Sequence, residues 1–222
     1  MNQTARIIKF PTKAKAKKRP RIKNIDGVKY FSPKQIKILR RTVKDQADTG
    51  KMTHIREWMA IDLLTCTGLR VSEAANLRCG DLKIGYGDSK IFVRAGKGSI
   101  SGHLIIPDSL KKHLKSYSKW KQDQGESTGK DDHLFFGQRG SWTAQALQQI
   151  VKKYLKLLDL YEPGKSVHAL RHSYAMDLYA KEKDLRCVQK QLRHVSIQST
   201  LVYADVTDEE IASQVKNLYQ GR

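Results

Sequence analysis

Apolar side chains recur three or four residues apart along most of the chain, which is the spacing of helices that pack on a core. The first such helix is expected to begin at Ser32, where a serine cap is followed by Pro33 and, three residues after the cap, by Gln35. A second helix is expected over about His54–Cys66. It should end at Gly68, because glycine readily adopts the left-handed backbone that closes a helix.

The pattern changes after Gly68. A tight turn is expected to lead into a short helix and to aim Arg70 inward from the helix start. Three strand-like segments rich in β-branched residues come next, with a glycine-rich connection around Lys97 between the second and the third. They predict a small three-stranded antiparallel sheet with Lys97 at the tip of a hairpin. The segments are Asp81–Ile84, Lys90–Arg94 and Gly102–Pro107.

Helical spacing returns at Asp108 and continues to the end of the chain. Helices are expected over 108–123 and from about Thr143 to Leu160, with a polar loop and a short apolar run between them. A further helix begins after Gly164 and carries His168. The fold class is therefore expected to be mainly α with a small three-stranded antiparallel β-sheet (α+β), with residues 30–222 forming one domain.

Charge narrows the class of partner. The 222 residues include 42 Lys and Arg against 22 Asp and Glu, a net charge of +20, and an excess of that size favours nucleic acid or an anionic membrane surface. No apolar run approaches the ~18 residues of a membrane span, and no signal peptide follows the N-terminus. The cysteines Cys66, Cys79 and Cys187 form no C-x-x-C pair, which is typical of reduced thiols. Nucleic acid as partner and a cytoplasmic location, in the nucleoid, are expected.

Residues 1–29 concentrate the positive charge. This stretch holds ten basic residues and a single acid, Asp26, with Pro11 and Pro20 and few large apolar side chains, which predicts a disordered arm. A basic arm gains phosphate contacts and releases counterions on DNA; the alternative is a solvated tail that aids solubility. The residues expected to bind DNA are Lys13, Lys15, Lys17, Lys18, Arg19 and Arg21.

The stretch over 168–203 holds residues suited to chemistry. At ~100° per residue, His168 and Arg171 share one face of their helix, beside its apolar stripe. A lone histidine of this kind is more often a packing residue, but a guanidinium beside it offers a rigid fork for an anion such as phosphate. His168 and His172 also have the i, i+4 spacing of a zinc site. The glutamate of H-E-x-x-H is absent and the arginine opposes a cation, so no metal is expected.

Tyr203 and Lys97 are harder to interpret from their neighbours alone. Tyr203 comes after His194, on a short helix expected to be capped by Ser196, and a tyrosine is more often a half-buried packing residue than a nucleophile. The sequence around Lys97, Gly-Lys-Gly-Ser, invites a nucleotide-binding loop. A Walker loop requires lysine followed directly by Ser or Thr, with a helix after it, so this interpretation fails.

In their order along the chain, these residues resemble the tyrosine recombinase, or phage integrase, family. The resemblance covers about residues 32–220 and implies that family's catalytic fold. It also implies a reaction in which a tyrosine attacks a DNA phosphodiester, giving a 3′-phosphotyrosyl bond and a free 5′-hydroxyl, and a partner strand's hydroxyl then reverses the step. The covalent link conserves the bond energy, so no metal, ATP or other cofactor is implied. The matching blocks are Thr67-Gly68-Leu69-Arg70-x-x-Glu73, Gly96-Lys97-Gly98, His168-x-x-Arg171-His172, Leu192-x-His194 and Tyr203.

The resemblance implies roles for the residues that would bind the phosphate. Arg70 and Arg171 would hold the non-bridging oxygens and stabilise the charge of the transition state. His194 would donate a hydrogen bond to a non-bridging oxygen. Glu73 and His172 would act from behind them, by orienting their neighbours.

It likewise implies roles in proton transfer. Lys97 would protonate the leaving 5′-oxygen, and His168 would accept the proton of Tyr203. An unperturbed tyrosine, with a pKa of ~10, is almost wholly protonated at neutral pH, and the surrounding positive charge would favour its anion. The loop after Lys97 is less basic than is usual in the family, which leaves Lys90 and Arg94 as further candidates for its role.

The resemblance leaves the domain organisation and the type of recombination more open than the site residues. Many members carry a helical core-binding domain ahead of the catalytic domain, whereas here only the basic arm precedes Ser32, as in the short fimbrial phase-switch invertases. We expect a catalytic domain over 30–222 that acts on specific sites in double-stranded DNA as a homo-oligomer, a tetramer. A helix over 208–220 is expected to dock on this chain's own core or on a neighbouring protomer. Type IB topoisomerase-like relaxation and a non-cleaving DNA-binding accessory protein of the same fold remain alternatives to integration, inversion or resolution.

Overall fold

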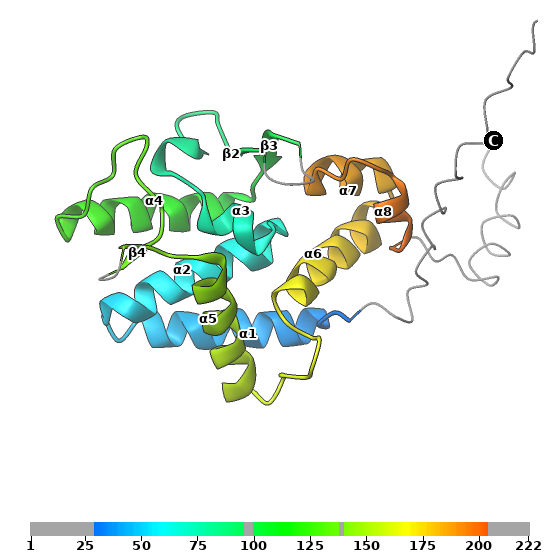
Figure 1. Cartoon of the computed structure of the whole chain (residues 1–222), viewed down its shortest axis with the longest axis horizontal. Coiled ribbons are helices and arrows are strands. Elements are labelled where there is room, and N and C mark those ends of the chain that lie inside the picture. Colours follow the sequence, from blue (N-terminus) through cyan, green and yellow to red (C-terminus); the bar gives the residue numbers. More distant parts are fainter. Residues whose placement is uncertain (1–28, 96–99, 138–139, 204–222) are drawn as a thin grey trace, which may run out of the picture.

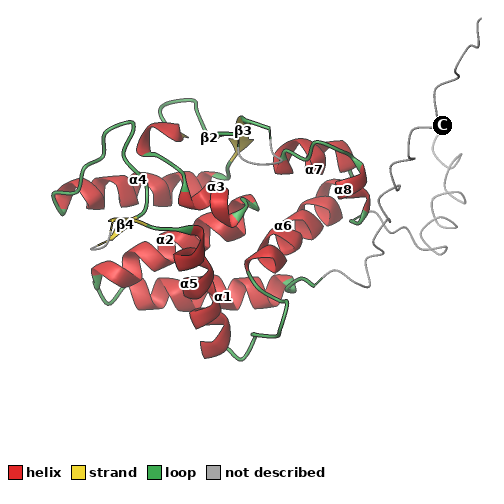
Figure 2. Cartoon of the chain, in the orientation of Figure 1, coloured by secondary structure: helices red, strands yellow, loops and turns green. Residues whose placement is uncertain are grey.

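Helices make up most of the fold, and a small antiparallel sheet lies along one edge of it (Figures 1 and 2). The structure is a computed structural model that describes residues 29–95, 100–137 and 140–203. The fold class predicted from the sequence is confirmed. The helices are α1 (Pro33–Ala47), α2 (Met52–Thr67), α3 (Val71–Ala75), α4 (Asp108–Asp123), α5 (Ala144–Leu157), α6 (Val167–Glu182), α7 (Leu185–Leu192) and α8 (Gln198–Leu201). The strands are β1 (Leu82–Lys83), β2 (Lys90–Val93), β3 (Gly102–Ile105), β4 (Phe136–Gly137) and β5 (Gly140–Ser141).

The first helix begins as predicted. The Ser32 hydroxyl accepts a hydrogen bond from the backbone N–H of Gln35, and the Gln35 side chain accepts one from the N–H of Ser32, so both groups at the helix start are satisfied. Leu39 and Val43 are buried against the rest of the core. Lys29, the last residue of the predicted arm, donates to the carbonyl oxygen of Pro163 and so contacts the domain.

The second helix, α2, is the centre of the fold. Every residue from Glu57 to its end is buried, and it contacts α1, α4, α5 and α6. It ends at Gly68, whose φ of 61° is the left-handed conformation expected there. The turn after Gly68 leads directly into the short helix α3, so Arg70 is fixed at the junction between two buried elements.

The three-stranded sheet has the predicted order, β1-β2-β3, with both pairs antiparallel. Its first strand is shorter than predicted because Asp81 ends a 3₁₀ turn over Cys79–Asp81. The Asp81 carboxylate accepts from the N–H of Arg78 and pairs with Arg94, which holds it in that turn. The predicted hairpin tip with Lys97 lies outside the described residues.

The middle of the chain follows the prediction closely. Helix α4 has the predicted bounds, and α5 begins after Thr143, whose hydroxyl accepts from the N–H of Ala146. Helix α5 ends at Leu157 instead of near Leu160, because Asp159 takes a positive φ of 53° that stops the helix. The two-stranded sheet of β4 and β5 was not predicted.

The C-terminal part of the described chain forms a second, smaller apolar cluster. Ala175 of α6, Val188 and Leu192 of α7 and Tyr203 are its buried members. Helix α7 was not predicted, and its start is capped by Asp184, which accepts from two backbone N–H groups. The sequence had suggested that Tyr203 lies on a short helix, but it lies in the turn after α8.

Cys66, Cys79 and Cys187 are free thiols. Within the described parts of the chain, no helix has both the length and the apolar character needed to cross a membrane. Most of the predicted arm and the whole predicted docking helix over 208–220 lie outside the described residues.

Candidate functional site

Arg171 joins three parts of the fold. It lies on α6 and only 6% of the residue is exposed. Its Nη1 donates to the carbonyl oxygen of Gly68, at the end of α2, over 2.5 Å, and its Nη2 donates to that of Leu192, at the end of α7, over 2.8 Å. Burial, and then the charge of Arg70, lowers the pKa of Arg171 to about 10. Arg171 therefore stays cationic at neutral pH and holds the ends of α2 and α7 together.

Arg70 and Glu73 form an ion pair at the start of α3. The backbone N–H of Arg70 donates to Glu73 Oε2 over 2.9 Å, and its Nη1 donates to Oε1 over 3.0 Å. The Arg70 side chain is 29% exposed and that of Glu73 is 4% exposed. The Arg70 side chain is therefore accessible to a ligand at the surface, whereas that of Glu73 is not.

A second arginine, Arg193, contacts the same carboxylate. Its Nη2 donates to Glu73 Oε2 over 2.6 Å. Burial alone would raise the pKa of Glu73, but Arg193 and the N–H of Arg70 outweigh burial, and the pKa lies below its ordinary value. The guanidinium groups of Arg70 and Arg193 thus both pair with one ionised carboxylate, and that of Arg171 lies near enough to be affected by its charge. The cluster keeps positive charge that Glu73 cannot neutralise, which suits a phosphate.

His194 follows α7 and borders the same charges. Its Nδ1 lies 2.9 Å from the hydroxyl of Thr200. Burial, and then the positive charges of Arg171 and Arg70, lowers the pKa of His194 to about 4. His194 is therefore neutral at neutral pH, and one of its ring nitrogens carries a proton that can be donated.

Tyr203 is buried in this structure, with 3% of the residue exposed. Its hydroxyl lies 2.7 Å from Nδ1 of His172, and the two rings are 5.8 Å apart. Burial raises the pKa of Tyr203 to about 12, although Arg171 acts in the opposite direction. The tyrosine is protonated at neutral pH, and His172 is the group placed to exchange a proton with it.

The structure brings together most of the residues predicted for the site. Arg70, Arg171, His194 and Tyr203 gather around the ends of α2 and α7, with Glu73 and His172 in contact with members of this group. His168 is exposed in the first turn of α6, and its role as proton acceptor stays a prediction. Lys97 and the arm residues Lys13, Lys15, Lys17, Lys18, Arg19 and Arg21 lie outside the described residues.

Of the two further candidates for the role of Lys97, one is already engaged. Arg94 pairs with the buried Asp81 over 2.8 Å, whereas Lys90 is exposed on β2. Sequence reasoning missed Arg193, although its position directly before His194 could have suggested it.

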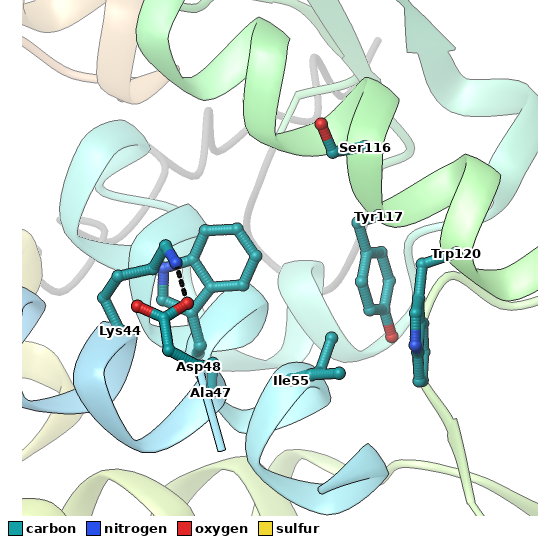
Figure 3. A pocket seen from close by; sticks show the side chains of 8 residues that line it. Lys44, Ala47, Asp48, Ile55, Ser116, Tyr117 and Trp120 are labelled. Atoms are coloured by element: carbon teal, nitrogen blue, oxygen red, sulfur yellow. Dashed lines mark hydrogen bonds and ion pairs between the residues drawn. The ribbon is translucent and has the colours of Figure 1, made fainter. Parts of the chain in front are cut away.

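A separate pocket lies between the α1–α2 pair and α4 (Figure 3) and has a volume of about 190 Å³. Its lining is mainly aromatic and aliphatic, and none of the predicted site residues belongs to it. An apolar pocket does not suit a polyanion, so the arginine cluster is the better candidate for the functional site. The lining residues are Lys44, Ala47, Asp48, Ile55, Trp58, Ser116, Tyr117 and Trp120.

Comparisons with known proteins show what the chain as a whole is similar to. The model of the Phage integrase family matches residues 29–210. Tyrosine recombinase XerD of Oceanobacillus iheyensis is 36% identical over 172 residues, which are 75% of this chain and 54% of that protein. Tyrosine recombinase XerC of Herpetosiphon aurantiacus is 31% identical over 191 residues, which are 84% of this chain and 61% of that protein. The chain thus spans between half and two thirds of the length of these relatives.

Solved structures show the same similarity in three dimensions. A crystal structure of XerA recombinase matches with a TM-score of 0.66 and 25% identity, over 86% of this chain and 65% of that one. The XerH site-specific recombinase, in a pre-cleavage complex with its difH substrate, matches with a TM-score of 0.68 and 27% identity, over 83% of this chain and 52% of that one.

Proposed function

The chain belongs to the phage integrase family of tyrosine recombinases, and from this premise we propose that it is a site-specific DNA recombinase. It would cut and rejoin DNA strands through a 3′-phosphotyrosyl link to Tyr203, without a metal or ATP. One observation carries the proposal: an arginine cluster with excess positive charge lies close to Tyr203. Arg171 of this cluster and His172, which contacts Tyr203, are neighbours on α6. Integration, inversion and resolution all use this chemistry.

The arginines would stabilise the charge that develops on the phosphate. Arg171 is fixed by two backbone carbonyls, so its guanidinium needs little rearrangement when charge develops nearby. Arg70 is partly exposed and can turn from Glu73 toward a non-bridging oxygen. His194, neutral and bordering both arginines, would donate its ring N–H to a non-bridging oxygen.

Tyr203 has to change its surroundings before it can react. With 3% of the residue exposed, its hydroxyl cannot reach a phosphate of the DNA backbone. We therefore infer that the structure represents a resting state, and that DNA binding moves the segment after α8 so that the hydroxyl leaves His172. His168, exposed at the start of α6, would then accept the proton as the P–O bond forms. Lys97 would protonate the leaving 5′-oxygen.

The partners proposed are double-stranded DNA at specific sites and further copies of the same chain, as a tetramer. Support for DNA comes from the net charge of +20 and from the XerH complex with a difH substrate. We propose accordingly that the protein acts in the nucleoid, within the cytoplasm. The basic arm would add phosphate contacts outside the site.

The test is a suicide substrate, a duplex with a nick close to the cleavage position, made from sites mapped in DNA that flanks the protein's own gene. Cleavage releases a short fragment, and the protein stays linked to the 3′-phosphate. We expect the unchanged protein to form a covalent adduct and Tyr203→Phe to form none. An adduct that persists in Tyr203→Phe would remove Tyr203 as the nucleophile. Relaxation of supercoiled DNA without sequence preference or synapsis would indicate a topoisomerase instead.

A further inference from the structure

Arg193 has a costly conformation for a residue that is not glycine. It follows α7 with φ 52° and ψ 44°, in the left-handed region, where the Cβ of an L-residue is crowded. Only 7% of the residue is exposed. Its Nε is buried and has no hydrogen-bond partner among the described residues. A strained and incompletely satisfied residue of this kind is a candidate for a functional role.

The side chain of Arg193 shares Glu73 with Arg70. The Arg193–Glu73 pair is 2.6 Å long, and both side chains are nearly closed to solvent, at 5% and 4% exposed. Arg193 takes Oε2, together with the N–H of Arg70, which leaves Oε1 for the guanidinium of Arg70. A carboxylate and an arginine form their strongest pair when both oxygens accept from one guanidinium. Arg193, together with the N–H of Arg70, occupies the oxygen that the Arg70 guanidinium would need for that arrangement.

We propose that Arg193 is a positioning residue that neutralises Glu73 and so leaves Arg70 available to the scissile phosphate. The inference rests on the proposed recombinase function. Without Arg193, Arg70 would be the main counterion of a buried carboxylate, and Glu73 would both hold Arg70 back and repel the phosphate. The position of Arg193 in the chain also suits this role, because both of its neighbours belong to the site. Arg171 donates to the carbonyl oxygen of Leu192, and His194 directly follows Arg193.

The test uses two substitutions, alone and combined. Arg193→Met removes the charge and keeps an unbranched side chain. We expect it to lower the rate of adduct formation at saturating DNA by ~10-fold or more, with a change in DNA dissociation constant of less than ~3-fold because Arg193 itself is buried. Adding Glu73→Gln should then raise the rate above that of Arg193→Met, because the carboxylate that restrains Arg70 is gone. The effects of two contacting residues need not add, and here the second is expected to reverse the first.

Two other variants separate positioning from a purely structural role. Arg193→Gly relieves the backbone crowding, so it should unfold at a temperature no lower than Arg193→Met, yet cleave as slowly. Arg193→Lys keeps the charge near Glu73 and should recover part of the rate. The proposal also survives if Arg193→Met fails to fold, since the glycine variant and its Glu73→Gln combination then provide the same comparison.

Two results would contradict the role of Arg193. An unchanged rate in Arg193→Met and Arg193→Gly, or a Glu73→Gln that lowers the rate further in either background, would overturn the role given to Arg193. These outcomes differ from a failure of the proposed function. In that case the unchanged protein forms no adduct on any mapped site, or Tyr203→Phe forms one.

Discussion

His168 and His172 differ in burial, although they are one helical turn apart. His168 is exposed, whereas His172 contacts the hydroxyl of the buried Tyr203 over 2.7 Å. We expect His168→Ala to change the free energy of unfolding by less than ~0.5 kcal/mol but to slow cleavage by ~100-fold, the usual contribution of a proton acceptor. His172→Ala leaves a buried hydroxyl without its partner and should cost ~1–2 kcal/mol of stability. Urea unfolding and adduct formation, measured on both variants, check the assignment. Equal rate losses would mean that His172 shares the role.

His194 makes stability depend on pH. Its pKa is lowered to about 4 in the folded protein, against ~6.5 in an unfolded chain. The unfolded state therefore takes up a proton first as the pH falls, and the stability associated with neutral His194 is present above pH ~6.5 and lost as the pH falls toward about 4. We expect a loss on the order of 2 kcal/mol over this range, which is less than the whole shift of the pKa would give because His194 is partly exposed to solvent; the loss should be absent in His194→Gln. Thermal unfolding at a series of pH values measures it. Parallel pH profiles for the two proteins would contradict the lowered pKa.

At the scale of elements, the end of α2 fixes the geometry of the site. Gly68 has a φ of 61°, and an added Cβ would lie 2.6 Å from a ring carbon of Tyr174 and 3.0 Å from a methyl of Leu192. Gly68→Ala should therefore displace α6 and α7 and cost ~2–3 kcal/mol, from backbone strain and overpacking together. Gly50→Ala is the matched control, since Gly50 has a φ of 77° and open space around it, and should cost only ~1 kcal/mol. Urea unfolding of the two variants separates backbone strain from overpacking. Equal losses in the free energy of unfolding would show that packing at Gly68 is loose.

Which elements the sequence predicts depends on how local their signals are. Helix α1 is specified by Ser32, Pro33 and Gln35 within one turn, and its start at Pro33 was predicted to the residue. Helix α7 has two buried positions, Val188 and Leu192, too few to establish a helical period. The sheet of β4 and β5 has only two residues in each strand. Such elements are stabilised mainly by the tertiary structure around them.

The same distinction applies to the site. Arg70 and Arg171 could be named because each lies in a short motif, and Tyr203 because it follows these motifs in a known order. The pairing of Arg193 with Glu73 joins residues 120 positions apart, and no local pattern marks it. The burial of Tyr203 also depends on packing between α6 and α7, which spacing alone does not give.

At the scale of the whole molecule, the net charge of +20 is expected to contribute to DNA affinity in addition to the contacts made by the site. Lys29 contacts the domain through Pro163, so a variant that begins at Lys29 removes the basic stretch and leaves this contact. We expect that variant to bind DNA more weakly and with a flatter dependence on salt, because each lost phosphate contact reduces the slope of log K against log salt by ~0.9. A full-length variant with Gln at Lys13, Lys15, Lys17, Lys18, Arg19 and Arg21 is the control for length. It should match the truncation if charge is the cause. Binding titrations at several salt concentrations supply the slopes.

If both slopes equal that of the unchanged protein, residues 1–28 form a solvated tail, and the arginine cluster with the domain surface supplies the affinity.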